Sequence, residues 1–271
     1  MRWEMNTEFG LPQIFVEQLE IVAKNVKDNR ADCLGLFVGG ERLGKSTLQT
    51  RVAMTFEKFL GTELKLRRDY HYELRSFVKS CLEVPYPDND GKLYPKKGGL
   101  HYIKVYDEPV LGANARKWAS EGNVLLNQAF ATIGYKYLIT LASIPSIWML
   151  DNMIREHRVA FMCSVTGKVS DDGMIQKGFF NLYNGKAVKK IYKDRETRQT
   201  HYPRTKFMDM RFQSMEGTAF WNQYEEFSAK AKQDTITDLL NETTNLKPTT
   251  RQKAEIVNEI IYGDANGQWC Y

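Results

Sequence analysis

A glycine-rich stretch near the N-terminus constrains the fold of this chain more than any other feature. Residues 33–38 form a short apolar run, and the pattern Gly39-x-x-x-x-Gly44-Lys45-Ser46 follows it directly. This pattern matches the phosphate-binding loop, or P-loop, in which glycines let successive backbone N–H groups turn toward an anion. The stretch therefore predicts a buried strand, a P-loop and a helix, in that order.

The helix after the loop is predicted over residues 46–60, because apolar side chains recur there at helical spacing and Gly61 follows as a stop signal. Its N-terminus would face the phosphates, where free N–H groups and the helix dipole favour negative charge. In this interpretation Lys45 reaches the β and γ phosphates and the Ser46 hydroxyl ligates Mg²⁺. The predicted nucleotide-binding residues are Gly39, Gly40, Glu41, Arg42, Leu43, Gly44, Lys45, Ser46 and Thr47.

A second stretch ends in two acidic residues. Residues 102–106 form an apolar strand pattern, and Asp107 and Glu108 follow it directly. In P-loop ATPases such a strand places an aspartate beside Mg²⁺ and a glutamate beside the attacking water, because phosphoryl transfer requires a held metal and an oriented nucleophile. We therefore predict that Asp107 supports the metal and that Glu108 activates water. Two exposed acids at a strand end are the alternative.

Strand-like and helix-like segments alternate along the first 165 residues. This alternation predicts an α/β fold with a mostly parallel sheet and helices on both faces, in which ligands bind at the carboxyl ends of the strands. The predicted helices cover residues 12–29, 46–60, 124–133 and 147–154, and the predicted strands cover residues 33–38, 102–106, 137–144 and 158–165. Residues 64–84 are predicted to hold a strand followed by a short helix.

The pattern changes after residue 165. Asn184-Gly185 stands between two strand-like runs in residues 179–192, which predicts a type I′ hairpin. Residues 217–232 have a helical pattern, and a polar linker and a last amphipathic helix are predicted over residues 241–248 and 249–262. The predicted domains are a P-loop core (1–165), a basic β-hairpin and helical extension (166–240), and a linker with a C-terminal helix (241–271).

Positive charge is concentrated in one segment, although the whole chain has a formal net charge of only +5. Residues 186–211 hold nine basic residues against three acidic ones, interleaved with aromatic residues. Cations can pair with phosphates and aromatic rings can stack on unpaired bases, so the segment is a candidate DNA-binding surface. A solvated charged face is the alternative. The basic residues are Lys186, Lys189, Lys190, Lys193, Arg195, Arg198, Arg204, Lys206 and Arg211.

The cysteines are widely separated and form no Cys/His cluster, which argues against a zinc site or a disulfide framework. The N-terminus has no apolar signal region, and no apolar run approaches the ~18 residues of a membrane span. We therefore expect a cytoplasmic protein, or one of the host cytoplasm if the chain is viral.

Four motifs together resemble a known group of proteins. They are the P-loop, the strand ending in Asp107-Glu108, the stretch Leu141-Ala-Ser-Ile-Pro-Ser146, and the stretch Ile154-Arg-Glu-His-Arg-Val-Ala-Phe161. The chain resembles P-loop ATPases of the additional-strand catalytic-glutamate class, in the branch of FtsK and HerA. That branch includes DNA-pumping motors, virus packaging ATPases and zonula occludens toxin-like proteins. The resemblance implies a RecA-like fold, ATP and Mg²⁺ as cofactors, and a homo-oligomer.

The same resemblance implies a polar sensor at the end of the strand after the acidic pair, and an arginine that acts on a neighbouring subunit's site. Ser143 is the sensor candidate, although Ile144 stands where this branch often has glutamine. Ser143 could equally be a turn residue before proline. Arg155 and Arg158 are the arginine-finger candidates, whereas Arg116 and Lys136 are weaker alternatives.

The first hypothesis for function is therefore an oligomeric, ATP-hydrolysing motor that acts on nucleic acid, of the DNA translocation or packaging type. The second is an ATPase that drives protein assembly or morphogenesis without DNA as substrate. A small-molecule kinase would need an arginine-bearing lid, and a non-hydrolysing nucleotide switch would not need Glu108. The sequence does not decide between the first two hypotheses.

Overall fold

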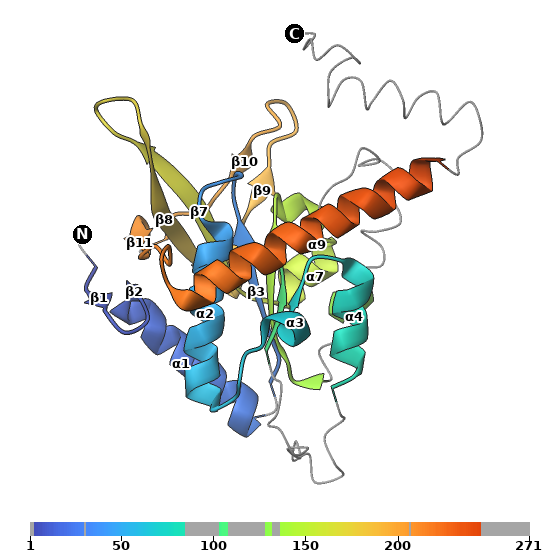
Figure 1. Ribbon diagram of the computed structural model, residues 1–271. Coiled ribbons are helices and arrows are strands. Elements are labelled where there is room, and N and C mark those ends of the chain that lie inside the picture. Colours follow the sequence, from blue (N-terminus) through green and yellow to red (C-terminus); the bar gives the residue numbers. More distant parts are fainter. Residues whose placement is uncertain are drawn as a thin grey trace.

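A seven-stranded sheet forms the centre of the computed structural model, which describes residues 3–29, 31–84, 103–107, 128–131, 136–205 and 207–244 (Figure 1). Within these residues the strand order is β11-β8-β7-β3-β6-β5-β4. The strands from β7 to β4 run parallel, whereas β8 runs antiparallel to β7 and β11 runs antiparallel to β8. The strands are β3 (Cys33–Val38), β4 (Tyr70–His71), β5 (Ile103–Tyr106), β6 (Ile139–Ile144), β7 (Val159–Val169), β8 (Ile175–Asn184) and β11 (Met210–Arg211). The predicted α/β class with a mostly parallel sheet is confirmed.

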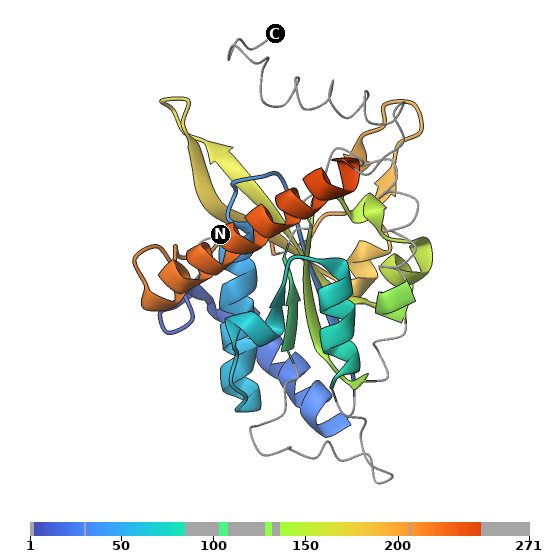
Figure 2. The same cartoon turned by 45° about the vertical axis from the view of Figure 1, so that its right-hand side comes forward.

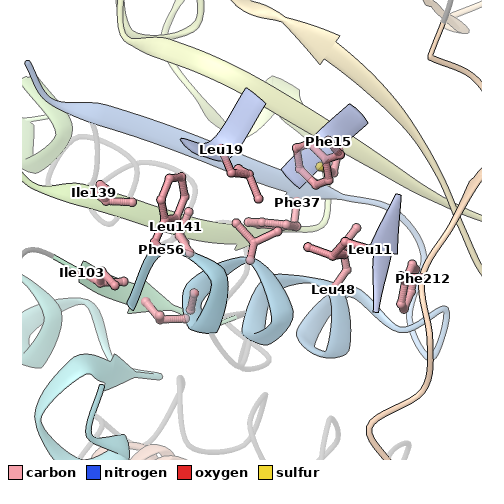
Figure 3. Packing of buried hydrophobic residues seen from close by; sticks show 14 of the residues in the cluster. Leu11, Phe15, Leu19, Phe37, Leu48, Phe56, Ile103, Ile139, Leu141 and Phe212 are labelled. Atoms are coloured by element: carbon pink, nitrogen blue, oxygen red, sulfur yellow. The ribbon is translucent and has the colours of Figure 1, made fainter. Parts of the chain in front are cut away.

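Helices cover both faces of this sheet, as the sequence predicts. Every residue of β3 is buried, because its alternate side chains enter two different cores. On one face, Phe37 and Leu141 pack with Leu48 and Phe56 of the P-loop helix (Figure 3). The helices on that face are α1 (Gln13–Asn29) and α2 (Lys45–Leu60); those on the other are α4 (Leu74–Leu82), α7 (Asn152–His157) and α8 (Gly185–Val188).

Local sequence signals predict the first helices well. Helix α1 begins one residue after the predicted start, and α2 begins one residue before it. Gly61 ends α2 in the left-handed conformation, and its N–H group bonds back to helical carbonyls, as expected for a glycine stop signal. Two other segments are more broken than predicted. Residues 64–84 form α3 (Leu66–Asp69), β4 and α4, and residues 147–154 are divided between a 3₁₀ turn, η3 (Ile147–Met149), and α7.

The prediction of a hairpin turn at Asn184-Gly185 is wrong. Asn184 is extended, with φ −75° and ψ 168°, and its side chain caps α8 by accepting a hydrogen bond from the Ala187 N–H. A type I′ turn would require positive φ at both central residues. Asparagine also serves as a helix N-cap, and the close approach of the Val159 carbonyl leaves no room for a Cβ on Gly185. The antiparallel hairpin lies earlier and joins β7 to β8 through residues 170–174, so the sheet continues past residue 165.

Two hairpins and one long helix lie at the end of the sheet that carries the P-loop (Figures 1 and 2). The hairpins are β7–β8 and the pair β9 (Tyr192–Lys193) and β10 (Thr200–His201). Helix α9 (Ala219–Thr244) crosses this end diagonally, and it extends into the segment predicted to be a linker. The predicted last helix, residues 249–262, lies outside the described residues. Among the described helices, none has the length and apolar character that a bilayer span requires.

The edge strand β4 carries a buried histidine. His71 Nε2 lies 3.1 Å from the Arg68 carbonyl oxygen, which assigns the ring proton to Nε2, and Nδ1 lies 3.0 Å from the Ser76 hydroxyl, which donates to it. Burial, and then the positive charge of Lys104, lowers the His71 pKa to about 4. The imidazole is therefore neutral in the folded protein near neutral pH.

Because His71 is buried in its neutral form, we expect the free energy of unfolding to decrease in mild acid. Between pH ~6.5 and ~4 the unfolded chain binds a proton at His71 that the folded chain does not, so the free energy of unfolding should fall by about 3 kcal/mol as pH decreases through this range. Urea titrations at several pH values would measure it. His71→Gln should reduce this pH dependence, and an equal slope in the variant would contradict the assignment.

Candidate functional site

The loop between β3 and α2 has a backbone that requires glycine at both ends. Gly39 has φ +154°, and a Cβ there would lie 2.4 Å from the Val165 carbonyl oxygen of the adjacent strand β7. Gly44 has φ +96° at the N-cap of α2. A side chain at either position would force the loop away from the sheet or strain its backbone. The two glycines thus shape the loop that leads into the α2 N-terminus, where no acidic side chain occupies the first turn.

Lys45 lies inside this loop. Its Nζ atom donates hydrogen bonds to the carbonyl oxygens of Gly39 and Gly40, at 2.8 and 3.1 Å, and the residue is buried. The ammonium group and the first N–H groups of α2 therefore gather positive charge at one point. Such an arrangement attracts an anion, and a phosphate chain is the anion that this loop geometry suits best.

The acidic strand reaches the start of α2 directly. The Ser46 hydroxyl donates a hydrogen bond to Asp107 Oδ1 at 3.1 Å, and Asp107 is only 1% exposed. The Asp107 backbone N–H bonds to the His71 carbonyl oxygen at 2.9 Å. From the same helix, Gln49 Nε2 donates to the carbonyl oxygens of Tyr106 and Leu141, at 3.2 and 3.0 Å. These bonds fix the position of the P-loop helix against the end of β5 and the middle of β6.

This donor set fits Mg²⁺ only together with phosphate oxygens. In the described part of the chain no group of three or more His, Cys, Asp or Glu side chains could hold a metal ion alone. Mg²⁺ is commonly bound by one or two protein oxygens plus substrate phosphates and water, because it keeps much of its hydration shell. Ser46 and Asp107 are the residues that would hold it here.

Ser143 brings a further polar group to this part of the sheet. It lies on β6, the strand between β3 and β5, one residue before the strand ends. The side-chain alternation of a strand puts it on the same face as Leu141, which is the face that α2 covers. Its hydroxyl is fully buried and has no hydrogen-bond partner among the described residues. A buried hydroxyl without a partner is costly. Ser143 does not itself line the cavity over the P-loop.

Helix α9 closes the site from the other side. The Tyr224 hydroxyl donates a hydrogen bond to Asp107 Oδ2, while the Tyr224 ring stacks on Trp221 with centroids 4.7 Å apart. Burial, and then the negative charge of Asp107, raises the Tyr224 pKa well above its usual value. The tyrosine is therefore a neutral donor to the carboxylate at any physiological pH.

A cavity of about 1660 Å³ lies over the P-loop, and all nine predicted nucleotide-binding residues, 39–47, line it. Its other walls include the start of β8, the segment around β11, helix α9 and part of the N-terminal segment (Trp3, Met5 and Pro12). Arg51 of α2 holds the β11 segment in place, because its guanidinium donates to the carbonyl oxygens of Gln213 and Ser214, at 2.7 and 2.6 Å. Residues far apart in the sequence thus enclose one anion-binding loop.

The arginine-finger candidates lie elsewhere. Arg158 pairs with Asp32 at 2.8 Å, at the edge of the sheet where β3 and β7 begin, opposite the P-loop. Arg155 stacks over the Trp148 ring at 4.4 Å, and Lys136 donates to the Leu82 and Val84 carbonyl oxygens after α4. None of these three lines the cavity, and neither do the buried Asp107 and Ser143, although Asp107 bonds to Ser46, which does line it. Glu108 and Arg116 lie outside the described residues.

The predicted basic segment is exposed around the β9–β10 hairpin. The eight of its nine basic residues that the structure describes are all exposed. Tyr192 and His201 stack on this hairpin with centroids 4.9 Å apart, and Tyr192 is 58% exposed. Phe212 is different, since it is buried against Phe180, and a Cβ on Gly44 would lie 3.0 Å from its ring. Cations and an aromatic pair therefore share one exposed hairpin.

Sequence reasoning missed Gln49, Arg51 and Tyr224. Gln49 could have been found from the sequence, because it is a polar residue one turn after Ser46 on the apolar side of the predicted helix. Tyr224 gave no such signal, because its spacing fits the apolar face of a helix. Comparisons of the sequence with protein-family models and with curated proteins find no match, so the assignment of this site rests on its own residues and geometry.

Proposed function

We propose that this chain is a Mg²⁺-dependent ATPase with a RecA-like fold. The observation that carries the proposal is the hydrogen bond between Ser46 and Asp107, which joins the P-loop helix to the acidic strand. A glycine-rich anion loop needs no such partner, whereas a metal–triphosphate site does. The strand order supports the same class, because β6 is an additional strand between the P-loop strand and the acidic strand.

In this proposal the residues of the site have separate tasks. The P-loop N–H groups and Lys45 bind the phosphates, Ser46 and Asp107 hold the metal, and Ser143 is the polar sensor. Glu108 would activate the attacking water. Mg²⁺ supplies charge neutralisation on the phosphates when it is bound. An arginine from a neighbouring subunit, Arg155 or Arg158, would complete the site in an oligomer.

We propose nucleic acid, most simply DNA, as the substrate on which this ATPase acts. The β9–β10 hairpin supports this choice, because it lies at the same end of the sheet as the P-loop and presents exposed cations beside the Tyr192–His201 stack (Figure 2). A second candidate is an ATPase that drives protein assembly. The tip of the β7–β8 hairpin favours it, since Val169, Met174 and Ile175 are 73%, 68% and 60% exposed there.

The test is steady-state ATP hydrolysis with and without single- and double-stranded DNA, at several salt concentrations. DNA should stimulate hydrolysis, and charge reversal of the hairpin, Lys193→Glu/Arg195→Glu/Arg198→Glu, should abolish the stimulation and leave basal hydrolysis intact. The slope of log affinity against log salt should become shallower by up to about three, since each lost phosphate contact contributes ~0.9. DNA binding itself can be measured by fluorescence anisotropy.

The matched control reverses three exposed lysines on α1 and α4, Lys24→Glu/Lys27→Glu/Lys79→Glu, and should leave the stimulation unchanged. Hydrolysis that ignores DNA at every salt concentration would remove DNA as the substrate and favour the assembly hypothesis. Absence of Mg²⁺-dependent hydrolysis, with and without DNA, would contradict the ATPase proposal as a whole.

A further inference from the structure

Asp107 has a hydrogen-bond donor on each of its two carboxylate oxygens. The Ser46 hydroxyl donates to Oδ1, and the Tyr224 hydroxyl donates to Oδ2. The two partners are unlike in origin, because Ser46 belongs to the P-loop helix and Tyr224 to α9, 117 positions from Asp107 along the chain. Both Asp107 and Tyr224 are buried, at 1% and 4% exposure. Water therefore does not easily replace either partner.

Aromatic contacts hold α9 against the same edge of the sheet. Tyr70 of β4 meets the rings of Tyr224 and Phe220 with centroids 5.7 and 6.3 Å apart, and Tyr72 meets Phe227 at 5.8 Å. These contacts are apolar and do not depend on what the site binds. The hydrogen bond from Tyr224 is different, since it ends on the carboxylate that would support a metal. It is a direct link between the chemistry of the site and the position of α9.

A carboxylate beside Mg²⁺ accepts hydrogen bonds from the water that the metal retains. On Asp107, Ser46 already uses one oxygen, and Tyr224 uses the other. We propose that Tyr224 competes with Mg²⁺–nucleotide for Asp107, so that binding at the P-loop releases α9 from its polar contact. This inference rests on the proposed nucleotide site and concerns its regulation: the position of α9 depends on whether the site is occupied. The aromatic contacts then act as the hinge of this helix.

The proposal predicts whether one substitution strengthens or weakens the binding of Mg²⁺–nucleotide. Tyr224→Phe keeps the ring and its stacking on Trp221 and removes only the hydroxyl. An interaction that is made in the free protein and lost on binding opposes binding, so its removal should tighten Mg²⁺–nucleotide affinity. A hydrogen bond to a buried carboxyl oxygen is costly to lose, and we expect the dissociation constant to fall by about tenfold.

The experiment measures binding of a fluorescent ATP analogue to the full chain, in Mg²⁺ and in EDTA. Tyr224→Phe should bind more tightly than wild type in Mg²⁺ and equally in EDTA. Tyr70→Phe is the matched control, because it removes a neighbouring buried hydroxyl and leaves the hydrogen bond from Tyr224 to Asp107 in place. Its affinity should equal that of wild type in both buffers.

Hydrogen exchange of the wild-type protein provides a second measurement that needs no variant. A Mg²⁺-bound, non-hydrolysable ATP analogue should increase amide exchange in residues 220–228, and Tyr224→Phe should show that increase without the analogue. Equal or weaker affinity of Tyr224→Phe in Mg²⁺, or unchanged exchange in α9, would overturn the proposal. If wild type bound no Mg²⁺–nucleotide at all, the proposed ATPase function would fail and the inference with it, and the two failures are thereby distinguished.

Discussion

Replacing Lys45 by alanine is expected to weaken Mg²⁺–ATP binding by roughly a hundredfold, because loss of one partner from a buried charge pair typically costs about 2–5 kcal/mol. The Lys45 ammonium is buried inside the P-loop, within 2.8 Å of the Gly39 carbonyl oxygen. The other basic residue of the loop is Arg42, which is exposed and has a backbone φ of +60°. Alanine would remove the buried cation of the loop and leave the phosphate charge to the backbone N–H groups, the metal and the exposed cations that line the cavity.

Isothermal titration calorimetry with a non-hydrolysable ATP analogue would measure this loss. Lys58→Ala is the matched control, since Lys58 lies on the same helix but is 59% exposed on the surface and pairs with Glu8. It should bind the analogue as wild type does. Circular dichroism would establish that the Lys45 variant is folded, and unchanged affinity in a folded variant would mean that the P-loop is not a nucleotide site.

The parts of the site that sequence reasoning located are those encoded by neighbouring residues. The P-loop, the strand before it and the helix after it depend on glycines, an apolar run and helical spacing, all within residues 33–61. The strand that carries Asp107 is also a local pattern. The Ser46 hydroxyl lies 3.1 Å from Asp107 Oδ1 because the carboxyl ends of parallel strands lie at the same edge of a sheet. This proximity follows from the topology of the sheet and not from a local sequence pattern.

The parts that sequence reasoning missed depend on contacts between distant segments. Tyr224 lies at helical spacing with Phe220 and Phe227, so its position fits packing alone. Its contact with Asp107 requires α9 to cross the sheet edge, which no local pattern specifies. At Asn184-Gly185 the local pattern predicts a turn that the protein does not form. The Val159 carbonyl oxygen lies close to Gly185, and Asn184 is instead the N-cap of α8. Tertiary context determined both outcomes.

A buried ion pair beneath the site was also not visible in the sequence. Lys104 of β5 lies three residues before Asp107, and its Nζ is 3.1 Å from Asp69 Oδ1, with side-chain exposures of 3% and 2%. Arg68 also donates to Asp69, as does the Lys65 N–H. Burial by itself would raise the Asp69 pKa, but the hydrogen bond from Arg68 and the charge of Lys104 lower it below its usual value. The carboxylate is therefore ionised in the folded protein.

Asp69→Ala is expected to lower the free energy of unfolding by about 3–5 kcal/mol, because it leaves the buried Lys104 ammonium without a counter-charge. Urea denaturation at pH 7.5 would measure this, since a carboxylate with a lowered pKa contributes fully above its unfolded pKa and loses its contribution as pH falls through the folded value. The double variant Asp69→Ala/Lys104→Met removes both charges, so it should recover most of the loss. Equal destabilisation of the single and double variants would show that Asp69 acts through its bonds to the Lys65 N–H group and Arg68, and not through its ion pair with Lys104.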